Sequence, residues 1–278
     1  MTKTKQRRRK RKARGPLASV LLVVFILSFA FSAYQILSIL WESYRADRAY
    51  IELRSLAQAQ PAPTAGSEAE ASEAAAQETP APTAAEKRKS SVDIPELRKA
   101  YPEMSAWLYA EGTGINYPVM QAADNQFYLT HLYDGSENIH GALFADYRNT
   151  GILTDDNTVI YGHNMRDGEM FHVLGEYQAQ DFFEAHPTMR ITTEDGDYLI
   201  ELISGTLEDG DYEFVRFSFE NFEEMSAYVA GIRARSTFDS DAVLQPGDRL
   251  VSLCTCNYNL RNGRYMLLGR VAGTADEN

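Results

Sequence analysis

Residues 249–271 read RLVSLCTCNYNLRNGRYMLLGRV. Two apolar runs flank a short loop that ends in Asn262-Gly263. Apolar runs of this length are typical of buried strands, and Asn-Gly is typical of a tight turn between antiparallel strands. The sequence therefore predicts two neighbouring strands, and their pairing brings Arg264 close to Cys256.

Other short strand-like runs precede this pair, separated by Gly, Asn and Asp. A helix start is expected at Asp93, because Pro95 stands at an early helical position. A second helix is expected from about Phe219 to Arg235, where apolar residues recur at helical spacing. Many strands with few helices predict a mostly antiparallel β barrel with added helices, in a domain spanning 92–278. The expected strands are INYPVM (115–120), GALFADY (141–147), NTVIYGH (157–163), MRITT (189–193), DYLIELISG (197–205), RLVSLCTC (249–256) and RYMLLGRV (264–271).

The N-terminal region has the pattern of a membrane anchor. Residues 1–16 contain nine Lys/Arg and no acid, and residues 17–40 contain no charged side chain. A bilayer core requires roughly 20 apolar residues in a helix, whereas a cleaved signal has a shorter apolar region. We therefore expect an uncleaved single-pass transmembrane helix at 17–40. The positive-inside rule leaves the basic tail in the cytoplasm and the rest of the chain outside the cell membrane.

The segment 41–91 is expected to separate the anchor from the folded domain. Residues 42–56 favour a helical extension, and the Ala/Pro/Glu-rich stretch that follows has almost no large apolar side chain. Such a composition cannot offset the entropy of ordering, so a disordered spacer is expected, holding the domain away from the membrane.

Composition excludes several classes of protein. All 39 Asp/Glu follow residue 16 and the net charge is −12, which argues against nucleic acid binding, because phosphates require a positive face. Only two cysteines are present, so a disulfide framework is excluded. The mean hydropathy of −0.36 excludes a polytopic membrane protein.

Three residues can together perform acyl transfer. His163 follows the strand-like run VIYG, Cys256 stands near the end of its strand, and Arg264 begins the next one. A thiolate can attack a carbonyl to form a thioester, an imidazole can move protons, and a guanidinium can stabilise the oxyanion. Each residue alone is a weak signal. A buried Cys is commonly a small core residue, and a Gly-His turn or an Arg after Asn-Gly is commonly solvated.

These segments resemble the sortases, the cysteine transpeptidases of Gram-positive cell surfaces, and most of all class B. The family signature T-L-x-T-C reads Ser252-Leu253-Cys254-Thr255-Cys256 here, with Ser replacing the first Thr. The family's catalytic His matches His163 in YGHNM, and its essential Arg matches Arg264. The stretches 113–131 and 141–149 and the late helix are also similar to class B.

The resemblance implies an eight-stranded sortase β barrel and a defined reaction without a cofactor. A surface protein's C-terminal sorting signal is cut after Thr, and the acyl group passes through a Cys256 thioester to a peptidoglycan-precursor (lipid II) amine or to a pilin Lys. His163 is the implied acid/base and Arg264 the implied oxyanion or substrate clamp. The implied groove residues are Thr255, Asn164, Asn125 and Leu129, the last two expected one helical turn apart.

Alternatives remain at this point. The enzyme could polymerise pilins, or act as a thiol protease that only hydrolyses, or be an idle wall-binding scaffold. Cys254 is expected to share the face of Cys256, either as a small groove residue or as a partner in reversible oxidation. A metal at Cys-x-Cys is disfavoured, because no histidine lies nearby in the sequence. The acidic runs 194–197 and 208–211 are expected to be polar hairpin turns rather than calcium sites.

Overall fold

The computed structural model describes residues 16–58, 92–209, 215–257 and 263–271. The chain forms two compact units, 1–45 and 46–278. Helix α1 (Pro16–Gln58) crosses the boundary between them. In the described part of the chain, Val20–Ala57 is the one helix long and apolar enough to cross a membrane, with a mean hydropathy of 2.4 in its most apolar window.

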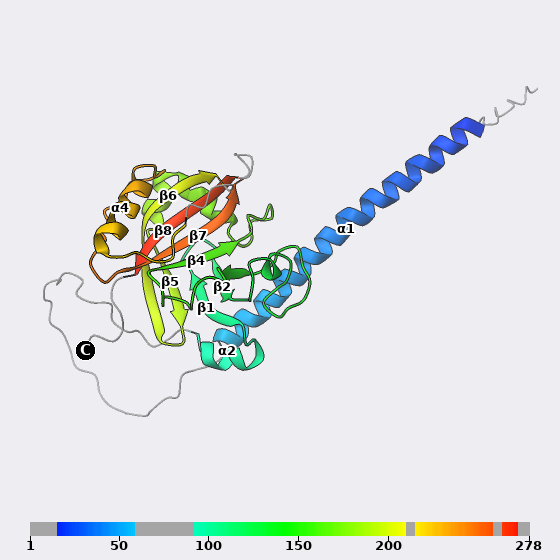
Figure 1. The fold of residues 1–278 in the computed structure, drawn as a ribbon. Helices are drawn as coiled ribbons and strands as arrows, with labels where there is room; N and C mark the ends of the chain where they lie inside the picture. The colour runs from blue at the N-terminus through cyan, green and yellow to red at the C-terminus, as the bar shows by residue number, and fades with distance from the viewer. Residues whose placement is uncertain (1–15, 59–91, 210–214, 258–262, 272–278) are drawn as a thin grey trace, which may run out of the picture. The chain divides into compact units, whose positions relative to one another are not determined.

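Eight strands close into a barrel in the second unit (Figure 1). Around the barrel their order is β1-β2-β3-β4-β7-β8-β6-β5. The eight-stranded β barrel implied by the family resemblance is therefore confirmed. The pairs β2–β3 and β4–β7 are parallel, and the other pairs are antiparallel. The strands are β1 (Met104–Tyr109), β2 (Asn116–Met120), β3 (Leu143–Ala145), β4 (Asn157–Gly162), β5 (Thr188–Thr193), β6 (Gly196–Asp209), β7 (Arg249–Asn257) and β8 (Gly263–Val271).

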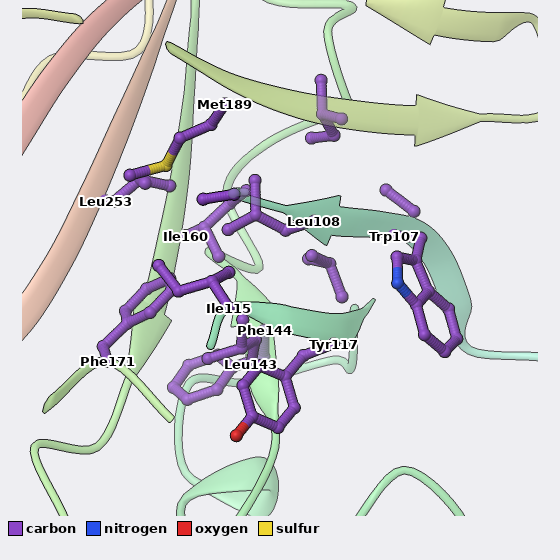
Figure 2. Close-up of a cluster of buried hydrophobic side chains, with 14 of the residues drawn as sticks. Trp107, Leu108, Ile115, Tyr117, Leu143, Phe144, Ile160, Phe171, Met189 and Leu253 are labelled. Carbon is purple, nitrogen blue, oxygen red and sulfur yellow. The ribbon is translucent and has the colours of Figure 1, made fainter. Parts of the chain in front are cut away.

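The barrel core follows from alternation along the strands. On β7, Val251 and Leu253 join the main core, whereas Leu250 and Cys254 join a second apolar cluster. Successive side chains of a strand point to opposite faces, so β7 contributes to both clusters. Figure 2 shows Leu253 and Met189 among the side chains of the main core. Both faces of β7 are thus buried, which explains why apolar residues occur at both odd and even positions of this strand.

Helix α4 (Phe222–Arg233) covers the second apolar cluster. It buries Met225, Val229 and Ile232 against residues of β4, β6, β7 and β8. The expected helix began at Phe219, but Asn221 caps the observed one, because its side chain accepts a hydrogen bond from the backbone of Glu224. The helix lies between β6 and β7 in the chain, before the expected nucleophile.

Short helices join the remaining strands. In α2, the Asp93 side chain accepts a hydrogen bond from the Glu96 backbone at 2.9 Å, as expected of a helix start. The acidic turn 194–195 joins β5 to β6 as a hairpin. Glu208, by contrast, lies within β6, and residues 210–211 lie outside the described residues. The short helices are α2 (Ile94–Ala100), η1 (Phe127–Leu129), η2 (His172–Gln178) and α3 (Gln180–Ala185).

The barrel unit begins earlier than the sequence suggested. The compact unit starts at Ala46, not at Val92. Tyr50 and Leu53, from the last turns of α1, are buried in the main core. The domain boundary expected at 91/92 therefore differs from the structure, because part of the core comes from residues before the 59–91 segment.

Candidate active site

Three neighbouring strands bring the predicted site residues to one end of the barrel. The parallel pairing of β4 with β7 sets Gly162 opposite Thr255, so His163 follows directly beside the end of β7. The antiparallel pairing of β7 with β8 sets Cys256 opposite Arg264. The predicted hairpin is thereby confirmed. The position of Cys256 follows from the pairing of its backbone with that of Arg264.

His163 is held in place by two backbone contacts. Its Nε2 lies 2.7 Å from the carbonyl oxygen of Leu129, and its own carbonyl accepts a hydrogen bond from the Phe171 backbone at 2.9 Å. A carbonyl oxygen can only accept a hydrogen bond, so Nε2 of His163 carries the ring proton. Nδ1 is then the ring nitrogen that can take up a second proton. The last position of β4 requires Gly162, because a Cβ there would stand 2.4 Å from the Leu143 side chain and 2.7 Å from the Phe171 ring.

Arg264 is partly buried between two strands that carry ionisable groups. Its cross-strand partner on β6 is Glu208, and its partner on β7 is Cys256. Glu208 is nearly buried and forms an ion pair with Arg235 at 2.8 Å. Directly opposed side chains of paired strands share one face of the sheet. Arg264 therefore places a positive charge at the strand position directly opposite Cys256.

Cys254 packs in the apolar cluster beneath α4 rather than in an open groove. It is 1% exposed. Burial raises the pKa of its thiol far above the ordinary value, and the nearby Arg264 opposes this only in part. A thiol that stays protonated is a poor nucleophile and oxidises slowly. The structure thus favours a small core residue over the oxidative partner considered from the sequence.

Asn125 and Leu129 do not lie on one helical turn. The described 3₁₀ helix η1 covers only Phe127–Leu129, so Asn125 precedes it. The Asn125 amide donates to a carboxylate oxygen of Asp146 at 3.0 Å, and its side-chain oxygen accepts from the Tyr147 backbone. Leu129 is 37% exposed, and its carbonyl accepts from His163. Leu129 therefore contacts the predicted acid/base His163, whereas Asn125 is held by Asp146 and Tyr147.

Thr255 and Asn164 occupy different surroundings. Thr255 is 2% exposed, and within the described part of the chain its hydroxyl has no hydrogen-bond partner. Asn164 follows His163, and its side-chain oxygen lies 2.8 Å from Nδ1 of His172. Asn164 also forms an isolated bridge with Met170, which folds the segment after His163 back on itself.

Asp146 links the elements around the candidate site and was not singled out from the sequence. Its carboxylate is fully buried, and it accepts hydrogen bonds from Arg148, Asn125 and the Tyr161 hydroxyl. Burial alone would raise the pKa of Asp146, but the hydrogen bonds from Arg148 and Asn125 hold it below the ordinary value. An acid inside the apolar run GALFADYRN was the available signal, because a buried carboxylate requires partners.

A cavity of about 250 Å³ lies away from these residues. In the part of the chain that the structure describes, no group of three or more His, Cys, Asp or Glu is arranged to hold a metal ion. The cavity walls come from α1, β1, β2, β5 and Val92 and include none of the predicted site residues. They are Arg54, Ala57, Val92, Trp107, Tyr109, Asn116 and Arg190.

Comparisons with known proteins identify similar sequences and folds. No protein-family model matches the chain. Sortase B of Listeria monocytogenes is 33% identical over 181 residues, which cover 64% of this chain and 74% of that protein. The solved Staphylococcus aureus sortase B–substrate complex aligns with a TM-score of 0.61 at 27% identity, covering 66% of this chain and 85% of that one.

A solved sortase B complexed with triglycine aligns equally well, with a TM-score of 0.61 at 27% identity, over 65% of this chain and 86% of that one. Sequence and structure thus converge on one family, and the aligned region includes the barrel. This chain belongs to the class B sortases, a family of cysteine transpeptidases.

Proposed function

We propose that this chain is a membrane-anchored sortase that cuts a C-terminal sorting signal after Thr and transfers the protein to a cell-wall amine. One observation carries the proposal. The strand register sets Cys256 opposite Arg264, and Thr255 opposite the glycine that precedes His163. These are the three residue types that acyl transfer through a thioester needs.

Each residue has one role in this reaction. The Cys256 thiolate attacks the Thr carbonyl carbon, and the C–N bond to the following residue breaks. His163, protonated at both ring nitrogens, gives the Nδ1 proton to the leaving amine. Arg264 stabilises the oxyanion of each tetrahedral intermediate. An incoming amine then attacks the thioester, His163 takes its proton, and the Cys256 thiolate leaves.

The contacts at His163 support this division of roles. Its Nε2–H is engaged by the Leu129 carbonyl, which leaves Nδ1 for proton exchange. Asn125 and Leu129 would lie beside the bound peptide, with Asn164 and Thr255 as further groove residues. Asp146 would act indirectly, because its buried carboxylate accepts a hydrogen bond from Asn125 and holds that side chain in place.

The proposal includes the location of the enzyme. Residues 17–40 would span the cell membrane once, with the basic tail in the cytoplasm and the barrel outside. The clients would be surface proteins bearing a sorting signal. The solved relatives contain a substrate in one case and triglycine in another. By analogy, this chain would accept a sorting peptide and an amine, here a peptidoglycan-precursor amine.

The test uses the full chain in detergent with short peptides bearing Asn-Pro-x-Thr or Leu-Pro-x-Thr. Each is incubated with and without glycine- or diaminopimelate-type amines, and products are identified by mass spectrometry. A joined peptide is expected, and Cys256→Ala should abolish it. Cys254→Ala is the matched control on the same strand and should retain the activity.

The other outcomes separate the alternatives. Cleavage without a joined product with any amine would replace the transpeptidase with a thiol hydrolase. Joining only to a Lys side chain of a pilin peptide would instead identify a pilin-polymerising enzyme. Neither cleavage nor a thioester with any peptide would overturn the proposed activity.

A further inference from the structure

The last turns of α1 form an interface with the barrel that the sequence did not reveal. Along residues 46–57, one face of the helix is buried at Ala46, Tyr50, Leu53 and Ala57. The spacing of three and four residues is that of a single helical stripe. The other face is exposed, with Ile51 and Leu56 open to solvent. The helix therefore lies on the barrel as an amphipathic helix lies in an apolar groove.

Polar contacts fix the register of this helix. The Tyr50 hydroxyl donates to the Gly141 carbonyl at 2.9 Å, and Arg54 Nε donates to the Asn116 carbonyl at 2.9 Å. In the opposite direction, the Tyr133 hydroxyl donates to the Ala49 carbonyl at 2.9 Å. These three bonds join the helix to β2 and to the segment that leads into β3. A helix that packed only through apolar contact would not require them.

Aromatic contacts reinforce the same position. The Tyr50 ring lies edge-on to Tyr117 at 5.1 Å and tilted against Tyr133 at 5.4 Å. The Arg54 guanidinium lies 4.8 Å from the centre of the Tyr117 ring. Both kinds of contact are favourable beyond the burial of area. Tyr117 belongs to β2, so the helix is attached to the barrel wall itself.

The 59–91 segment consequently begins and ends on the same compact unit. Ala57, just before it, and Val92, just after it, line one cavity. The barrel unit starts at Ala46. Residues 41–45 therefore connect the apolar segment 17–40 to this unit along the chain. The segment 59–91 joins two parts of one unit and does not join the anchor to the barrel.

We propose that the helix 46–57 is a noncovalent clamp that keeps the barrel attached to its anchor even after the chain is cut within 59–91. The surface at β2 is thus covered by this chain's own helix 46–57. The proposal does not depend on the enzymatic activity. It assigns attachment to the helix interface and leaves the Ala/Pro/Glu-rich segment free to be cleaved without release.

The test introduces a site for a specific protease after Ala75 in the full chain, which carries an N-terminal affinity tag and is kept in detergent. After complete cleavage, the N-terminal fragment is captured and washed, and the C-terminal fragment is quantified. Co-capture of both fragments is expected. Recovery of the C-terminal fragment in the flow-through, with cleavage complete and the fragment still folded, would overturn the proposal.

Two substitutions on the same helix provide a matched pair. Leu53→Asp places a charge in the buried face, whereas Leu56→Asp places the same charge on the exposed face. After cleavage, Leu53→Asp should lower the captured fraction by about tenfold or more, and Leu56→Asp should leave it unchanged. Equal retention of both would place the attachment elsewhere. If Leu53→Asp does not fold, Tyr50→Ala replaces it, with circular dichroism of the uncut chain confirming the fold.

Discussion

The imidazole Nε2 of His163 lies 2.7 Å from the carbonyl oxygen of Leu129. This contact defines the tautomer, because the carbonyl oxygen can only accept a hydrogen bond, so Nε2 is the donor. It also connects the proposed acid/base to η1, the turn that carries Leu129. A residue that forms this hydrogen bond without titrating should therefore separate the structural role of His163 from its chemical role.

His163→Gln is such a change, since the Gln amide can still donate toward Leu129 but cannot exchange protons near neutral pH. We expect the thermal midpoint to stay close to wild type and the rate of peptide joining to fall about 10²- to 10⁴-fold. The rate is measured by chromatography of the joined product. A variant with unchanged midpoint and near-wild-type rate would exclude His163 as the acid/base.

Asp146→Asn should weaken the fold in a pH-dependent way. The folded-state pKa of Asp146 lies below the ordinary value of 3.8, so its contribution to stability is present above that value and is lost as the pH falls through the folded pKa. At pH 7 we expect a loss of about 2–3 kcal/mol, from weakened hydrogen bonds to a buried charge. Below pH 3 the difference should shrink.

Urea unfolding of the full chain in detergent at pH 2 to 7 measures this difference. The exposed Asp241→Asn is the control and should leave the midpoint unchanged. A constant loss at every pH would mean that the ionised form of Asp146 is not what stabilises the fold.

The two cysteines should differ in reactivity. Burial raises the pKa of the Cys254 thiol so far that its thiolate is scarce at neutral pH. Brief treatment of the native enzyme with iodoacetamide should give a single adduct at Cys256, and unfolding in urea should expose Cys254 to a second. Peptide mapping by mass spectrometry measures both. Labelling of Cys254 in the native enzyme at a comparable rate would contradict its burial.

Much of the barrel could be predicted because most of its strands carry local signals. The runs around Ile160, Leu253 and Leu267 are apolar and bounded by turn residues, and each became a strand. β1 was missed, because MSAWLY does not alternate regularly between apolar and polar residues, although Pro102 and Gly112 bound it. It forms through pairing with β2 and β5, which are contacts that no local pattern reveals.

The candidate site was predictable to the extent that its residues stand at strand ends. Arg264 could be placed near Cys256 from the hairpin alone. The parallel pairing that brings His163 to the same end depends on the long-range partnership of β4 and β7. The composition of the 59–91 segment is typical of a linker between two domains. The burial of Tyr50 and Leu53 in the main core shows instead that the residues before this segment belong to the same unit as the barrel. Composition alone does not reveal that long-range packing.

Asp47 lies on the helix that carries those contacts, and its substitution should stabilise the enzyme. Burial raises the pKa of its carboxyl, Glu169 and Asp167 raise it further, and His140 and Arg54 oppose them. A carboxyl with a raised folded-state pKa weakens the fold once the pH exceeds its unfolded value of 3.8. Asp47→Asn removes that cost.

At pH 7.5 we therefore expect Asp47→Asn to raise the thermal midpoint, by the equivalent of less than about 1 kcal/mol because the side chain is largely exposed. The gain should vanish near pH 3, where the carboxyl is protonated in both states. Glu52→Gln, exposed on the same helix, is the control for the loss of one negative charge. An equal gain in both variants would assign the effect to net charge, whereas a gain confined to Asp47→Asn would assign it to the burial of this carboxyl and to the nearby Glu169 and Asp167.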